Sequence, residues 1–301
     1  MKNLDIQTKK IELNLPRGIR AEVNSDTLFH WDQETNLLIQ AYIPGVQRVE
    51  PSNQTKTLMI NHLESQLTQL DYLGLQANLK QEWNGKVPLD LLHLLYSMSR
   101  ISFLANNYFP THSACVENDE GAVLIVGHSG VGKTSLALQL VRDYNMRLFS
   151  GNKTLLYFED NKMKALAGTS TITIKEEDKF RWQGLINNVV YYWGRMAFQL
   201  KKEQYSERDN VQIKKIVLPK INKDVKESKV LPPVPAMHAL YPYIMDKVNA
   251  DTIIGFNIFL GDSPEGAENY LIMALHLALQ QTPVYVVAGP MEYLVDQIQE
   301  L

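Results

Sequence analysis

The sequence predicts an α/β protein: a mixed sheet with flanking helices, preceded by a β-rich N-terminal subdomain. Two observations support this fold class. An apolar strand at 122–126 runs through a glycine-rich turn into an amphipathic helix at 134–144. Around that unit, turn signals separate a series of short apolar runs. This pattern favours β-hairpins over a repeated β–α–β series, and therefore a sheet that mixes parallel and antiparallel strands.

The composition is that of an ordinary globular protein, long enough for one large domain or two smaller ones. The 301 residues are 45% hydrophobic, and the net charge of -3 provides no basic field for nucleic acid or an anionic membrane. We therefore expect neither as a partner. The single cysteine, Cys115, excludes an internal disulfide. The N-terminus lacks an apolar run of the signal type, and no window reaches the roughly 18 apolar residues of a membrane helix. We expect a cytoplasmic protein.

Residues 1–87 are predicted to form the β-rich subdomain. Alternating residues or short apolar runs predict strands at 11–15, 19–23, 37–43 and 57–61. Proline and glycine separate these segments. We find no site chemistry here, because the aromatic residues, Trp31 and Trp83 among them, lack interleaved basic residues and are interpreted as packing residues.

Residues 88–301 are predicted to form a second domain around the strand–turn–helix unit. The expected elements are a buried helix at 88–108, a strand and turn at 110–121, and strands at 146–150, 154–158, 163–168 and 171–174. A helix is predicted from residue 175, because Phe180, Trp182, Leu185 and Ile186 have helical spacing.

The last part of the chain is predicted to contain helices at 236–251, 267–280 and 291–301, and a strand at 284–287. Between 201 and 229, basic residues outnumber acidic ones around an apolar run at 211–218. We interpret this segment as a solvated hairpin or lid with one buried strand. A binding site for an acidic partner is the alternative.

The turn after the strand at 122–126 matches the phosphate-binding pattern G-x-x-x-x-G-K-[ST]. Its glycines allow consecutive backbone amides to face one cavity, and with the helix N-terminus they predict binding of a di- or triphosphate. Lys133 is expected to reach the outer phosphates, and the Thr134 hydroxyl to ligate Mg²⁺. His128 is expected to face solvent, or to contact a phosphate when protonated. The predicted binding residues are Gly127, His128, Ser129, Gly130, Val131, Gly132, Lys133, Thr134 and Ser135.

Four segments of the chain together resemble the HPr kinase/phosphorylase-like P-loop kinase superfamily, whose phosphate-binding fold is shared with phosphoenolpyruvate carboxykinase. They are residues 112–116, 122–134, 148–152 and 165–168. The resemblance covers roughly residues 90–301 and implies a nucleotide-binding domain at 88–301 that uses ATP and Mg²⁺. It also implies that His112 lies near the terminal phosphate. From the residues alone, His112 is equally compatible with a hydrogen-bonded core histidine.

One part of the family pattern is missing from this chain. The family carries paired carboxylates after the next strand, which serve the metal or act as general base, whereas this chain has Gly151 and Asn152. Asparagine can ligate Mg²⁺ through its carbonyl but has no useful basicity. With this substitution, the resemblance implies His112, Lys133 and Asn152 as the catalytic candidates.

Other charged side chains near the motif have two interpretations each. Glu159 and Asp160 could replace the missing acids, but their place at a hairpin tip favours a solvated turn. Arg195 could donate to a phosphate as a planar cation, or pack against Trp193.

Two functions follow from an intact motif and missing acids. The favoured one, by analogy, is a phosphotransferase that moves the γ-phosphoryl of ATP to a hydroxyl of a peptide or protein Ser/Thr or of a small metabolite. The alternative is a catalytically degenerate nucleotide-binding protein, acting as an ATP-dependent partner or accessory factor in a biosynthetic pathway. The expected partners are a nucleotide and a hydroxyl-bearing acceptor, and a homo-oligomer is left open.

Overall fold

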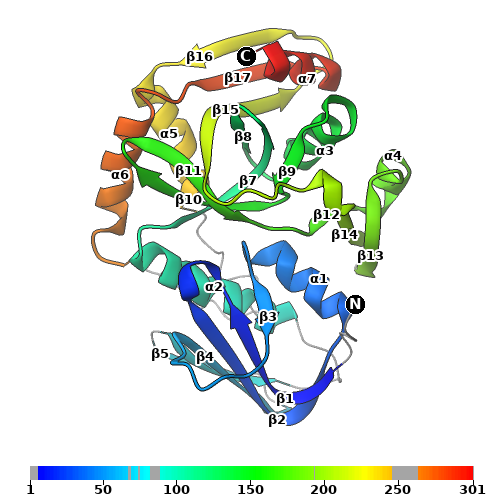
Figure 1. Ribbon diagram of the computed structural model, residues 1–301, viewed down its shortest axis with the longest axis vertical. Helices are drawn as coiled ribbons and strands as arrows, with labels where there is room; N and C mark the ends of the chain where they lie inside the picture. The colour runs from blue at the N-terminus through cyan, green and yellow to red at the C-terminus, as the bar shows by residue number, and fades with distance from the viewer. Residues whose placement is uncertain are drawn as a thin grey trace.

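The computed structural model describes residues 6–66, 69–73, 75–81, 89–192, 194–245 and 264–300. In these ranges the chain forms three sheets, with helices between and around them (Figure 1). The predicted fold class is confirmed, since the largest sheet mixes parallel and antiparallel strands and has helices on both faces. Among the described helices, none combines the length and the apolar character that crossing a bilayer requires.

The N-terminal sheet has six strands in the order β3-β1-β2-β4-β6-β5. Three of the four predicted strands are confirmed, at 11–15, 19–23 and 57–61. Their apolar residues alternate along each strand and share one core, while Glu12 and Glu22, which lie between apolar residues of β1 and β2, are also buried. The strands are β1 (Ile6–Asn14), β2 (Arg20–Trp31), β3 (Gln47–Val49), β4 (Leu58–Glu64), β5 (Gln69–Leu73) and β6 (Gln76–Gln81), with a short 3-10 turn η1 (Pro16–Gly18) between the first two.

The strand predicted at 37–43 is wrong, because this segment lies in the helix α1 (Gln33–Tyr42). The Asp32 side chain accepts a hydrogen bond from the Thr35 backbone amide at 2.8 Å and so caps the helix start. Leu37, Leu38 and Ala41 are buried, a spacing that places them on one helical face. A short apolar run fits a strand or a buried helix equally, and the cap decides between them.

The helix α2 (Leu89–Ala105) lies between the N-terminal sheet and the rest of the molecule (Figure 1). Its buried residues Leu91 and Leu95 belong to one apolar core. This core also contains Leu13 of β1 and Leu155, which lies in a later hairpin of the chain at 153–168. The N-terminal sheet is thus packed against later parts of the chain. The predicted boundary between residues 87 and 88 falls at 82–88, outside the described residues.

The central sheet has eight strands, in the order β11-β10-β7-β8-β15-β17-β16, with β9 paired to β7. The pairs β8–β15 and β15–β17 are parallel and the others antiparallel. The start of β15 also pairs with β11, so the sheet curls until its first strand meets its fifth. The strands are β7 (Phe109–Asn118), β8 (Gly121–Val126), β9 (Arg147–Ser150), β10 (Lys153–Glu159), β11 (Lys162–Gly168), β15 (Val211–Ile221), β16 (Glu227–Leu231) and β17 (Val284–Gly289).

Helices cover both faces of this sheet. Val123 and Ile125 of β8 pack in one core with α3 (Lys133–Tyr144) and α7 (Met291–Glu300). Leu124 and Val126 point to the other core, with α5 (Pro233–Ile244) and α6 (Ala267–Ala278). The helices predicted at 267–280 and 291–301 are therefore confirmed, and the helix predicted at 236–251 begins at Pro233; residues 246–251 lie outside the described ranges.

The segment 201–229 differs from the hairpin that the sequence predicts. A short 3-10 turn, η3 (Lys202–Gln204), comes first. It is followed by one buried strand, β15, as expected, and then by one exposed strand, β16. The two strands do not pair with each other, because β17 lies between them. The insertion of β17 between β15 and β16 depends on a contact with a strand far along the chain, which local turn signals cannot reveal.

A third sheet has three strands in the order β12-β14-β13, namely β12 (Ile172–Lys175), β13 (Ile186–Tyr192) and β14 (Arg195–Leu200). The helix predicted from residue 175 shrinks to η2 (Glu176–Asp178) and α4 (Lys179–Trp182). Trp182 is buried, but Phe180 is 83% exposed and Ile186 already begins a strand. The β-branched and aromatic run before Tyr192 favours the strand over a longer helix.

Candidate functional site

The glycine-rich loop between β8 and α3 needs its glycines. Gly130 and Gly132 have φ angles of 86° and 87°, in the left-handed region that other residues adopt at a cost. A Cβ atom on Gly132 would lie 2.4 Å from Cδ1 of Ile221, and one on Gly127 would lie 2.9 Å from Cγ2 of Val131. The loop therefore turns tightly against the end of β15, as the motif predicts.

The start of α3 is suited to bind an anion. No side chain caps this helix end, whose N-cap residue is Gly132. In a helix the first backbone amides have no intrahelical carbonyl partner, here those of Lys133, Thr134 and Ser135. These amides and the partial positive charge of the helix N-terminus make this end of α3 favourable for an anion.

Lys133 closes the loop in this conformation. Its side chain is buried, and its Nζ donates hydrogen bonds to the Gly127 and His128 carbonyl oxygens, at 2.7 and 2.9 Å. The charge is thereby fixed behind the loop and beside the start of α3. A phosphate oxygen at this place would replace a carbonyl partner of the ammonium, which exchanges a neutral acceptor for a charged one.

Two further loop residues contact elements outside the loop. The Thr134 hydroxyl donates to the Gly151 carbonyl oxygen at 3.5 Å, which links the helix start to the turn between β9 and β10. The exposed His128 ring packs edge-on against Tyr243 of α5, with 5.1 Å between the ring centroids. His128 is thus exposed, which is one of its two predicted placements, and its contact with a phosphate stays a prediction.

In front of the loop lies a cavity of about 490 Å³. The loop contributes Ser129, Gly130 and the helix start to it, while Gly127, His128 and Val131 lie outside its lining. His112 and Asn152, both predicted from the family resemblance, face the same space. The structure thus brings the glycine-rich loop at 127–132, called the phosphate loop below, close to the two other predicted catalytic residues, His112 and Asn152.

His112 reaches the cavity from β7. It is half-buried and is the Cα partner of Lys153 on β10. The alternate residues Thr111 and Ser113 are fully buried, and the Ser113 hydroxyl donates to the Thr154 hydroxyl at 2.9 Å. Because side chains alternate along a strand, β7 presents the imidazole to the cavity and its hydroxyls to the interior.

The positions of the missing carboxylates have structural roles here. A Cβ atom on Gly151 would lie 2.8 Å from Cγ1 of Ile172, so a side chain there requires the Ile172 side chain to move. The Asn152 side chain donates from Nδ2 to the Ala41 carbonyl oxygen at 3.1 Å, close to the end of α1. Asn152 therefore joins the site to the N-terminal region, and its Oδ1 is the atom through which it could approach a metal.

The cavity also has residues that the sequence analysis did not select. Tyr42 comes from the end of α1, Lys175 from the end of β12, Asp178 from η2 and Tyr192 from β13. Among the described residues of the lining, Asp178 is the one carboxylate. The Glu-Glu-Asp run at 176–178 was the signal, but it lay within a predicted helix and carried no pattern of a site.

The structure bears on the alternative interpretations of Arg195 and of Glu159 and Asp160. Arg195 lines the cavity, while its predicted packing partner Trp193 lies outside the described residues. Glu159 is exposed and pairs with Lys164, and Asp160 lies in the turn between β10 and β11. The interpretation of that turn as solvated is confirmed.

Both tyrosines of the lining are held neutral. Burial and the neighbouring Tyr42 together raise the pKa of Tyr192 to about 12, against opposing effects of Arg195 and Thr173. Burial also raises the pKa of Tyr42, and the charge of Arg195 opposes the shift. At neutral pH both phenols therefore keep a proton that they can donate.

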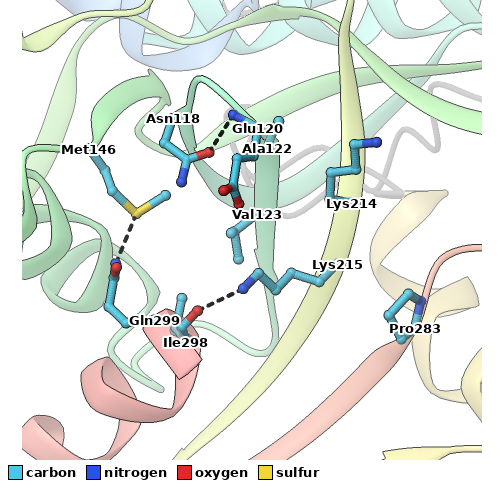
Figure 2. Close-up of a pocket in the computed structure, with 11 residues that line it drawn as sticks. Asn118, Glu120, Ala122, Val123, Met146, Lys214, Lys215, Pro283, Ile298 and Gln299 are labelled. Carbon is cyan, nitrogen blue, oxygen red and sulfur yellow. Dashed lines mark hydrogen bonds between the residues drawn. The ribbon is translucent and has the colours of Figure 1, made fainter. Parts of the chain in front are cut away.

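A second cavity, of about 360 Å³, lies at the opposite end of β8 (Figure 2). Glu120 and the first residues of β8 line it, and the half-buried Lys215 donates from Nζ to the Ile298 carbonyl oxygen at 2.8 Å. Burial lowers the pKa of Lys215, which Glu120 partly offsets. This cavity contains none of the predicted site residues and is separate from the phosphate loop.

In comparisons with known proteins, no family model and no curated protein matches the chain. Among solved structures, the chain is similar to the Hpr(Ser) kinase/phosphatase from Coxiella burnetii. The identity is 13%, the match covers 64% of this chain and 92% of that chain, and the TM-score is 0.29. A TM-score this low describes a loose likeness, so the activity of that protein is not carried over to this chain.

Proposed function

We propose that this protein binds ATP together with Mg²⁺ and transfers the γ-phosphoryl group to a hydroxyl-bearing acceptor. The observation that supports the proposal is the open start of α3, where backbone amides and Lys133 border a cavity that has room for more than phosphates. A polyphosphate fits this end because the amides need acceptors and the helix favours negative charge.

The residues that would hold the nucleotide and the metal come from two neighbouring turns. The loop amides and Lys133 would bind the polyphosphate, while the Thr134 hydroxyl and Oδ1 of Asn152 are oxygen ligands of the kind that Mg²⁺ accepts. Among the described residues no group of three or more His, Cys, Asp or Glu gathers around a point. Mg²⁺ bound largely through water and phosphate oxygens agrees with so few protein ligands, and it would neutralise phosphate charge.

Transfer requires a place for one proton. The acceptor oxygen forms a bond to the γ-phosphorus, the bond from that phosphorus to the β,γ-bridging oxygen breaks, and ADP leaves. The hydroxyl proton passes to a base on the protein. Asp178 and His112 are the candidates, since both line the cavity and either can accept a proton.

The second candidate function is ATP binding without transfer, in a partner or accessory role. It is favoured by the turn that replaces the paired carboxylates, because a side chain at Gly151 would press against Ile172 and the Asn152 amide is hydrogen-bonded to the end of α1. Loss of a general base typically lowers a rate by about 10²–10⁴-fold, so the two functions differ in degree of turnover.

Calorimetric titration with AMP-PNP and Mg²⁺ tests the binding step. We expect the wild type to bind, and Lys133→Ala to weaken binding at least about tenfold, because a charge-assisted contact is lost. The control Lys202→Gln removes an exposed charge outside the cavity and should leave affinity unchanged. Because Lys133 is buried, a thermal melt of each variant is needed to distinguish a loss of binding from unfolding. Thr134→Val provides a second variant of the loop for the same comparison. Wild-type protein that does not bind AMP-PNP would overturn the proposal.

Transfer of label from γ-labelled ATP to candidate peptides, sugars and hydroxy acids tests the second step. The phosphotransferase proposal expects incorporation that Asp178→Asn or His112→Ala diminishes while AMP-PNP affinity stays. If the wild type binds ATP but never moves label, and Asn152→Asp restores transfer, the accessory role is the correct one.

A further inference from the structure

The cavity beside the glycine-rich loop is also lined by Arg195, which has no hydrogen-bond or ion-pair partner among the residues that the structure describes. Arg195 is the first residue of β14 and is exposed. Its guanidinium makes no hydrogen bond or ion pair with any residue that the structure describes. An arginine offers a planar set of donors that match a carboxylate or a phosphate, so its presence in a cavity indicates an anionic ligand group.

The sheet places this arginine beside other residues that line the same cavity. Arg195 is the Cα partner of Lys175 on β12 and of Tyr192 on β13. Residues directly opposite each other in an antiparallel sheet have neighbouring side chains on one face. Tyr42 completes the group from the end of α1. A guanidinium, an ammonium and two phenols thus converge from four elements.

The charges that line the cavity are unbalanced. Lys175 already pairs with Glu177 at 3.3 Å, and Asp178 is the one carboxylate among the described lining residues. Lys133, the remaining cation with a long side chain, is engaged by the loop carbonyls. Among the described cations that line the cavity, the guanidinium of Arg195 is therefore the one available to bind an anionic ligand.

Arg195 belongs to a different part of the fold from the residues that would hold the donor. On the proposed function, the loop and the start of α3 hold the phosphates, whereas Arg195 lines the same cavity from the three-stranded sheet β12-β14-β13. Transfer in line requires the acceptor to approach the phosphorus from the side opposite the leaving oxygen, so the acceptor needs contacts other than those of the loop. A cavity of about 490 Å³ has the size of a small-molecule site.

We propose that Arg195, with the hydroxyls of Tyr42 and Tyr192, forms an acceptor subsite for a small hydroxyl-bearing molecule that carries a carboxylate or phosphate group. The anionic group binds the guanidinium and the phenols, and the acceptor's hydroxyl is thereby presented to the terminal phosphate. The inference rests on the proposed function, since it assumes that the loop holds the donor.

Binding of matched probes to the AMP-PNP–Mg²⁺ complex tests the subsite. Saturation-transfer NMR would compare glycerol 3-phosphate and glycerate, which carry the anionic group, with glycerol, which does not. We expect both anions to bind and glycerol not to bind. Arg195→Gln should weaken the anions at least about tenfold, as expected for loss of charged hydrogen bonds, and leave AMP-PNP affinity unchanged. The control Lys202→Gln should change neither.

Several results would overturn the inference. Anions that fail to bind the wild-type complex, or that bind Arg195→Gln equally well, would exclude the subsite. An equal loss of AMP-PNP affinity in Arg195→Gln would assign the arginine to the nucleotide. Binding of an acidic serine peptide in place of both small anions would show that the acceptor is a polypeptide. Failure of AMP-PNP to bind the wild type would instead refute the proposed function, so the two failures are distinguishable.

Discussion

At the scale of single residues, the site differs from the family pattern that the sequence resembles at one turn, where Gly151 and Asn152 replace the paired carboxylates. A side chain at Gly151 would press against the Ile172 side chain, and the Asn152 side chain donates a hydrogen bond to the Ala41 carbonyl oxygen. An asparagine can donate this hydrogen bond, whereas an ionised aspartate cannot. The loss of the carboxylate at residue 152 is thus linked to a structural contact between two parts of the chain.

Asn152→Asp is expected to lower the free energy of unfolding by about 1–2 kcal/mol, because a carboxylate oxygen would face the Ala41 carbonyl without a proton between them. Urea denaturation measures the change. Asn161→Asp, in the exposed turn after β10, is the control and should be nearly neutral. An unchanged stability of Asn152→Asp would mean that the contact contributes nothing.

Glu12 predicts a pH dependence of folding. Burial alone raises its pKa, but hydrogen bonds from Lys56 and Ser52 outweigh this effect and lower the pKa to about 2. Because the folded pKa lies below the unfolded value of 4.5, the stabilisation is complete above that value and is lost as the pH falls toward 2.

The stability difference between wild type and Glu12→Gln should therefore be larger at neutral pH than near the folded pKa of about 2. Urea denaturation across this pH range measures it, with Glu50→Gln, an exposed residue, as the control. A difference that is independent of pH would show that Glu12 does not keep its low pKa.

At the scale of elements, the chain's strands were more predictable than its site. Alternation of residues revealed β1, β2 and β4, and the motif revealed β8, the loop and α3. The same local reasoning mistook α1 for a strand and the region after β12 for a longer helix, because short apolar runs fit either structure. Tyr42 and Asp178 come from these two segments and were missed as cavity residues, whereas Arg195 was already a candidate donor to a phosphate.

The N-cap of α1 can be tested directly. Asp32→Ala should lower the free energy of unfolding by about 1 kcal/mol, since the Thr35 amide loses its acceptor. Asp32→Asn keeps a capping oxygen and should retain most of this stability. Urea denaturation of the three proteins gives the comparison, and equal losses in both variants would contradict the capping role.

The phosphate loop should not tolerate a side chain at Gly132. Gly132→Ala places a Cβ atom against Ile221 and adopts a left-handed φ angle, which together should cost about 1 kcal/mol or more. AMP-PNP affinity should fall as the loop shifts. Gly184→Ala is the matched control, because no atom lies within 4 Å of its added Cβ. A Gly132→Ala protein with unchanged stability and affinity would contradict the described loop.

At the scale of the whole molecule, one apolar core joins the N-terminal sheet, α2 and the β10–β11 hairpin. No local pattern reveals this continuity, because it depends on contacts between segments far apart in the chain. The sequence analysis placed a boundary at 87–88, and that division stays a prediction. What the structure adds is that α2, on one side of this boundary, packs with strands on the other.

A shared core predicts that the two regions unfold together. Leu91→Ala, in α2, should lower stability by about 2–5 kcal/mol and shift a single transition, because a buried side chain leaves a cavity. Hydrogen exchange would report whether amides of β2 and β8 respond alike. The exposed Leu28→Ala is the control. Protection lost in β2 but kept in β8 would show that the regions unfold independently.

The hydrogen bond from Asn152 to Ala41 has a consequence for how the chain can diversify. On the proposed function, the residues that bind the donor belong to one contiguous stretch, whereas the proposed acceptor subsite includes Tyr42 from a helix about a hundred positions earlier. Amino-acid exchanges in α1 can then retune which molecule is accepted while the glycine-rich turn stays as it is. Choice of acceptor and grip on the donor are, in this architecture, separately evolvable traits.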